Sequence, residues 1–212
     1  TTLWQVKYES NYARQLIDFT FDNQKQNFDF FRNEPYWKSR FGDTLKKEIT
    51  WAPFLVDLSN QLLEFKHDRK ILVEKVKTIA AKNNLSYLLN KELNDICPFT
   101  VIGMMNRQMT DSNRQAIAAD LAQALSVEST LPSDFDGIPL LNNMKSWFFS
   151  FEEFQQPNDI QNLWDFFESS IAFADGEDTV QANQVFIDSY NNLLKQKGIG
   201  WNITMALFWI RP

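Results

Sequence analysis

The chain has 212 residues, of which 44% are hydrophobic and 15% aromatic, and its formal net charge at pH 7 is −6. This composition excludes a disordered chain and suffices for a sizeable core. No apolar run approaches the roughly 20 residues of a membrane span, and no signal peptide is recognisable. The single cysteine, Cys97, excludes an internal disulfide and fits a reducing compartment. We therefore expect a cytoplasmic protein and, because the chain starts at Thr1 without Met, a piece of a longer one.

Charge is distributed unevenly along the chain. Residues 1–97 contain 15 Lys and Arg against 13 Asp and Glu, whereas residues 98–212 contain 6 against 14. An acidic surface repels a phosphate backbone. The second half therefore disfavours non-specific binding to duplex DNA unless its few cations converge on one patch.

Residues 1–97 are predicted to form a helical, aromatic-rich region that packs on the rest of the chain. Apolar side chains recur at spacings of three and four, which is typical of amphipathic helices. We expect helices over residues 37–49, after Thr50, after Asp68 and over residues 85–93. Cys97, next to an apolar run, is expected to be a buried, inert thiol.

Three apolar runs in the second half predict β-strands. Residues 99–105 contain no charge, include β-branched side chains and are entered through Pro98. Residues 146–151 and 201–210 have similar composition. We expect the three runs to share one small sheet, with Ile102 and Phe149 buried in it.

Amphipathic helices are predicted between and after these strands. Thr110 or Asp111 can cap the first, Asn158 or Asp159 the second, and a third is expected to begin near residue 179. The predicted fold class is thus α+β, predominantly helical, with one small sheet of about three to five strands in the C-terminal half. Residues 98–212 are expected to form an α+β region with a strand-helix core, in one compact unit with residues 1–97.

The sequence gives no sign of catalysis. It has no glycine-rich phosphate loop, and one His and one Cys cannot form a structural zinc site. The one cluster with the composition of a metal-dependent nuclease site is Asp134, Asp136, Glu152 and Glu153 with Lys145. Asp134 and Asp136 flank Phe135 just before a glycine, which is typical of a turn. We therefore predict that this chain is not an enzyme and has no catalytic residues, metal or cofactor.

Five motifs together suggest a family: FTVIGMMNR, DFDGIPLLNN, SWFFSFE, DIQNLWDFFESSIAFAD and WNITMALFWIRP. In combination they resemble the N-terminal region of bacterial McrB-like proteins, the AAA-type motor subunits of modification-dependent restriction systems. The resemblance covers residues 98–212. It implies a domain that reads DNA carrying a modified cytosine, followed in the full protein by a module that hydrolyses GTP or ATP. It also implies a separate nuclease subunit as partner and oligomerisation through the NTPase module.

Two functions are compatible with these observations. In the first, the chain recognises modified DNA, with phosphate or base contacts from polar side chains and stacking of an extruded base on tryptophan. The residues predicted for this role are Asn106, Arg107, Asn142, Asn143, Lys145, Trp147, Trp209 and Arg211. In the second, the chain is a protein-protein docking module that uses its aromatic surface and does not contact DNA. Turn formation by the asparagines and core packing by the tryptophans are the alternatives to any binding role.

Overall fold

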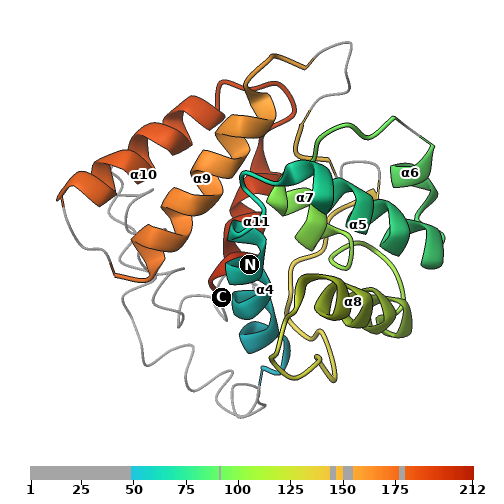
Figure 1. Ribbon diagram of the computed structural model, residues 1–212. Helices are drawn as coiled ribbons and strands as arrows, with labels where there is room; N and C mark the ends of the chain where they lie inside the picture. Colours follow the sequence, from blue (N-terminus) through green and yellow to red (C-terminus); the bar gives the residue numbers. More distant parts are fainter. Residues whose placement is uncertain (1–48, 91, 144–146, 150–154, 177–179) are drawn as a thin grey trace.

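The computed structural model describes residues 49–90, 92–143, 147–149, 155–176 and 180–212. These segments form a helical assembly (Figure 1). Its elements are α4 (Trp51–Leu63), α5 (Arg69–Lys82), α6 (Ser86–Leu89), α7 (Pro98–Gly103), α8 (Asp111–Leu125), α9 (Asp159–Ala174), α10 (Val180–Leu193) and α11 (Trp201–Ile210). Among the described residues there is no strand, and β-type pairing is limited to one isolated parallel bridge between Arg107 and Leu141. The predicted sheet is therefore wrong.

Most of the first predicted strand, residues 99–105, belongs to helix α7 (Pro98–Gly103). Cys97 is its extended N-cap and Pro98 occupies the first turn, where a missing N–H costs nothing. Every residue of α7 is buried, so the helix has no polar face whose spacing could reveal it. A short, fully buried helix and a buried strand have the same apolar sequence pattern. Proline thus marks a helix start here rather than entry into a strand.

The other two predicted strands are wrong for related reasons. Residues 201–210 form α11, whose buried side chains include Ile203, Leu207 and Trp209 on more than one side of the helix. Residues 147–149, the described part of the run 146–151, have irregular backbone. Within this run Phe148 is fully buried, whereas Phe149 is only half-buried.

Helix α4 lies at the centre of the assembly and contacts α7, α8 and α11 (Figure 1). Helix α9 packs on α7 and, along its other side, on α10. Helix α5 packs on α6 and α8. Helices that precede Cys97 therefore share a core with helices that follow it.

The helices predicted after Thr50, after Asp68, at Thr110 or Asp111, at Asn158 or Asp159 and near residue 179 are present. Of the helix predicted over residues 85–93, only Ser86–Leu89 is helical. Leu55, Leu58 and Leu62 of α4 are buried, as predicted. The same holds for the predicted inward positions Leu72, Val76 and Ile79 of α5 and Ile160, Leu163, Trp164, Phe167 and Ile171 of α9. The helix predicted over residues 37–49 lies outside the described residues except for Ile49.

Aromatic side chains make up much of the core between α7 and α9. The ring of Phe99 lies 5.7 Å from that of Phe148, 6.1 Å from Phe166 and 5.3 Å from Phe167, measured between centroids. Trp164 donates its indole N–H to the Ile96 carbonyl at 2.9 Å, which satisfies the only polar atom of this buried side chain. The segment before α7 is thereby fixed to α9.

Cys97 is buried, as predicted. Its sulfur lies 3.2 Å from the Thr100 hydroxyl oxygen. Burial raises the pKa of the thiol to about 12. The thiolate, which is the reactive form, is therefore scarce at neutral pH.

Phe148 and Phe149 form a matched pair for testing this packing. We expect Phe148→Ala to lower the free energy of unfolding by about 3–5 kcal/mol, because it leaves a ring-sized void beside Phe99. Phe149→Ala should cost less than half as much, since that ring is half-buried. Urea unfolding of both variants measures the difference. Equal losses would contradict the assignment of Phe148 to the core.

Candidate functional site

A polar turn follows α7, and Arg114 of α8 holds it. The Arg114 Nε donates to the Met105 carbonyl at 2.8 Å, and Nη2 donates to the Asn106 side-chain oxygen at 3.0 Å. The same guanidinium lies 3.9 Å from the centre of the Phe135 ring and 3.5 Å from an Asp111 carboxylate oxygen. Burial lowers the pKa of Arg114 to about 10, against the effect of Asp111, so the side chain stays charged at neutral pH. A buried turn carbonyl needs such a donor.

The polar turn after α7 also fixes the position of the segment around Leu141. The Asn106 carbonyl accepts a hydrogen bond from the Leu141 amide at 2.8 Å. Beyond this bridge, Arg107 Nη2 donates to the backbone carbonyl of Asn143 at 3.0 Å. The side-chain Nδ2 of Asn143 donates to the Gln108 carbonyl at 3.1 Å. Residues 106–108 and 141–143 therefore lie side by side.

Aromatic rings adjoin this pair of segments. The Arg107 guanidinium carbon lies 3.5 Å from the centre of the Tyr87 ring. Tyr87 meets Trp147 edge-on at 5.9 Å, and Trp147 meets Phe149 edge-on at 5.2 Å. The three rings are half-buried, so each retains some exposed surface. We call Tyr87, Arg107, Trp147 and Phe149 the aromatic–arginine patch.

Burial also changes the pKa of one group in the patch, the Tyr87 hydroxyl. It raises the pKa of the Tyr87 hydroxyl, although the nearby Arg107 charge partly opposes this. Tyr87 is therefore a neutral hydrogen-bonding group at physiological pH. An arginine stacked on a neutral ring forms a cation–π contact, which is worth most when it is shielded from water.

The residues predicted to bind DNA are only partly brought together. Asn106, Arg107 and Asn143 meet through the contacts given above, and Trp147 joins them through Tyr87. Asn142 is exposed in the same segment, whereas Lys145 lies outside the described residues.

Trp209 is fully buried, and this places it beneath the patch rather than in it. It donates its indole N–H to the Pro139 carbonyl at 2.9 Å and packs against Phe148. Asn106 is equally inaccessible, with 0% of its surface exposed. Core packing therefore accounts for Trp209.

Arg211 lies elsewhere and serves the fold. Its Nε and Nη2 bind the two carboxylate oxygens of Asp175, each at 2.7 Å. Nη2 also donates to the Asn60 side-chain oxygen at 2.8 Å. These contacts tie the end of α11 to the end of α9 and to α4. Arg211 has little capacity left for a phosphate.

Sequence reasoning missed two members of the patch, Tyr87 and Phe149, and it placed Phe149 in the core of a sheet. Tyr87 lies 20 positions before Arg107, on the short helix α6, and no periodic pattern connects the two. The only available signal was an aromatic residue in a predicted helix, which is more often a core residue.

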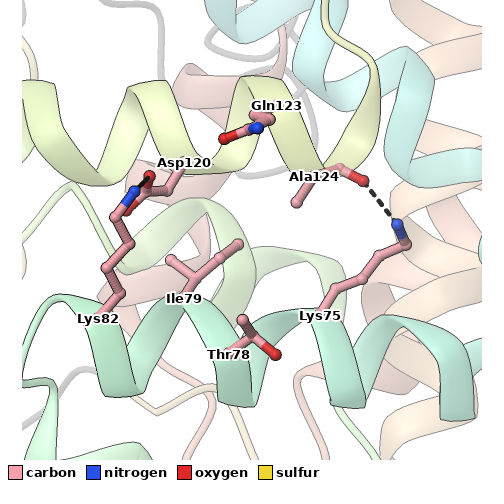
Figure 2. Close-up of a pocket in the computed structure, with 7 residues that line it drawn as sticks. All are labelled: Lys75, Thr78, Ile79, Lys82, Asp120, Gln123 and Ala124. Atoms are coloured by element: carbon pink, nitrogen blue, oxygen red, sulfur yellow. Dashed lines mark hydrogen bonds and ion pairs between the residues drawn. The ribbon is translucent and has the colours of Figure 1, made fainter.

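A hollow with a volume of about 250 Å³ lies between α5 and α8, away from the patch (Figure 2). Lys82 at one end binds Asp120 at 2.6 Å, and Asn83 donates to the other oxygen of that carboxylate at 2.7 Å. Lys75 at the opposite end donates to the Ala124 carbonyl at 2.8 Å, in the last turn of α8, where the helix dipole favours a cation. These polar groups join the two helices to each other. The polar residues around the hollow therefore have a structural role, which is to hold α5 and α8 together.

The acidic turn also has a structural role. Trp51 donates its indole N–H to the Asp136 carbonyl at 2.8 Å, and the Asp134 carboxylate accepts the Asp136 amide at 3.1 Å. In the described part of the chain no three His, Cys, Asp or Glu residues come together as a metal site. Glu152 and Glu153 lie outside that part.

A family model described as "Domain of unknown function (DUF8425)" matches residues 51–212, which include all the helices described above. The chain belongs to this family. The match begins at the first residue of α4, so the family domain includes the aromatic–arginine patch.

No curated protein and no solved structure matches the chain. The McrB-like origin stays a prediction. None of the helices described is long and apolar enough to span a membrane.

The link between α5 and α8 generates a pH-dependent prediction. Although desolvation opposes it, hydrogen bonds from Lys82 and Asn83 hold the pKa of Asp120 below its ordinary value of 3.8. Asp120→Asn should lower the free energy of unfolding by about 0.5–1 kcal/mol at pH 7. A lowered carboxyl pKa stabilises the fold above the unfolded-state value and ceases to do so as the pH falls through the folded-state value. The difference from wild type should therefore begin to shrink near pH 4 and decrease further toward pH 3.

Glu74→Gln is the matched control, because Glu74 and Lys77 form an exposed ion pair within α5 that does not join two helices. We expect it to change stability by less than about 0.5 kcal/mol. Chemical denaturation between pH 3 and pH 7 measures both variants. An Asp120→Asn difference that does not change with pH would contradict the assignment.

Proposed function

We propose that this chain is a protein-docking module of a McrB-like restriction system and that the aromatic–arginine patch is its contact surface. The observation that carries the proposal is the direct contact of Arg107 with Tyr87, and of Tyr87 with Trp147, in a cluster whose rings are half-buried and whose arginine is buried. Arginine, tyrosine and tryptophan are the residue types that contribute most to binding energy at protein interfaces. Such rings are already held in place, so binding costs little side-chain entropy.

The alternative is recognition of modified DNA. Arg107, Asn143 and Trp147 favour it, because a guanidinium, an amide and an indole are suited to phosphates and unstacked bases. Three observations weigh against it. Arg211 and Trp209 are engaged within the fold, Trp147 has rings against it on two sides, and residues 98–212 contain 6 basic against 14 acidic residues. Docking is the better-supported proposal.

The resemblance to McrB-like proteins defines the candidate partners. They are the AAA-type NTPase module, which in that family hydrolyses GTP or ATP and mediates oligomerisation, and the nuclease subunit. On this proposal the chain works in the cytoplasm, has no hydrolytic activity of its own and needs no cofactor. Its role is to connect components of the complex.

The test is binding of the 212-residue chain to the purified NTPase module and to the nuclease subunit, measured by calorimetry. Trp147→Ala should weaken binding about tenfold or more, as expected for an interface hot spot. Leu194→Ala is the control, because Leu194 is a 46%-exposed apolar residue that is not part of the patch. It should leave affinity unchanged.

A parallel arm titrates short duplexes, with and without modified cytosine, at two salt concentrations. Salt-sensitive duplex binding that Arg107→Ala weakens, in a chain that binds neither protein, would favour DNA recognition. If Trp147→Ala binds the partner proteins as tightly as wild type, the patch is not the contact surface.

A further inference from the structure

Three arginines are buried in the described part of the chain, and one of them differs from the others. Arg107, Arg114 and Arg211 have 8%, 3% and 7% of their surfaces exposed. Arg114 lies near the Asp111 carboxylate, and Arg211 binds Asp175 through two nitrogens. No carboxylate among the described residues lies within ion-pair distance of Arg107. Its Nε is also buried without a hydrogen-bond partner.

The contacts that Arg107 does make leave this deficit in place. Tyr87 covers one face of the guanidinium, and the Asn143 carbonyl accepts from Nη2. Both partners are uncharged. A buried charge with no anion near it among the described residues, and a buried N–H without an acceptor, each destabilise the free protein. The side-on fork of an arginine, formed by Nε–H and one N–H of Nη2, is the geometry that receives a carboxylate. In Arg107 the Nη2 group also donates to Asn143, and Nε–H is the unpaired member of the fork.

We propose that Arg107 is an anion-receiving subsite of the patch, into which a partner protein inserts an Asp or Glu carboxylate. This inference rests on the docking function proposed above and names the chemistry of the partner. The adjoining Tyr87 and Trp147 rings suit an apolar side chain next to that acid. A single carboxylate brings one negative charge to an acidic region, whereas a nucleic acid brings many. The observations therefore favour an acidic protein segment.

The first test observes the Arg107 Nε–H signal directly by NMR, in the full 212-residue chain. Sodium acetate is titrated against sodium chloride at constant ionic strength. We expect a saturable shift of the Arg107 signal. The signals of Arg114 and Arg211 should stay in place, because their Nε groups already donate to Met105 and Asp175. Lys70→Gln, which removes an exposed cation outside the patch, should leave the shift intact.

Inorganic phosphate supplies the competing arm. A shift with phosphate but not with acetate would overturn the carboxylate assignment, as would the absence of a shift with either anion. No partner protein is present, so this result is separate from the test of docking. If acetate binds at Arg107 but Trp147→Ala binds the partner as tightly as wild type, the docking role of the patch is refuted and the anion site at Arg107 is not.

The second test uses stability. Arg107→Met removes the unpaired charge while keeping much of the side-chain volume, so the melting temperature should stay the same or rise. Arg211→Met removes a buried arginine that binds Asp175 through two nitrogens, and should lower it by at least about 4 °C. A comparable loss for Arg107→Met would show that Arg107 serves the fold, and would overturn the proposal.

Discussion

The hydrogen bonds from Arg114 to the turn after α7 are the constraint on which the candidate site depends. At Met105 and Asn106 the chain leaves a buried helix and has to satisfy polar groups inside the core. One guanidinium from α8 satisfies the Met105 carbonyl and the Asn106 side-chain oxygen. Once Asn106 is fixed, its carbonyl receives Leu141, and Arg107 is directed toward Asn143 and Tyr87. Removing the arginine would leave buried acceptors unsatisfied, at a cost of about 1–3 kcal/mol for each.

Close packing beneath the turn makes the patch a rigid surface. A Cβ added at Gly103 would lie 3.6 Å from Leu141, 3.7 Å from Trp209 and 3.8 Å from Phe148. These are ordinary contact distances, so a methyl group would fit there but a larger side chain would not. Helices α7 and α11 therefore pack closely against Leu141 and Phe148, and this order lowers the entropy that a partner's binding would cost.

The sequence predicted the two-faced helices well and the buried helices badly. Leu55, Leu58 and Leu62 alternate with polar residues at helical spacing because α4 retains an exposed side. Helix α7 has none, so nothing in its sequence distinguishes it from a strand. Neighbours in the fold, rather than local preference, decide the structure of such segments. The register of Phe148 and Phe149 was missed for the same reason, since alternation was assumed where the backbone is irregular.

The candidate site shows a similar division. Of the residues predicted to bind, Arg107, Asn143 and Trp147 do come together through the contacts described above. Arg211 does not join them, because it pairs with Asp175, which lies 36 positions earlier, and no local pattern announces the pair. Tyr87 was missed for an equally physical reason: its stacking on Arg107 arises from tertiary packing.

Native-state hydrogen exchange at the Leu141 amide tests the central claim most directly, because that amide reports whether the turn and the patch are joined. In an Arg114→Lys variant a single ammonium cannot reproduce the guanidinium's divergent bonds to Met105 and Asn106. We predict that exchange of the Leu141 amide becomes at least about tenfold faster while amides within α9 keep their protection. Unchanged protection of Leu141 in that variant would contradict the dependence of the patch on Arg114.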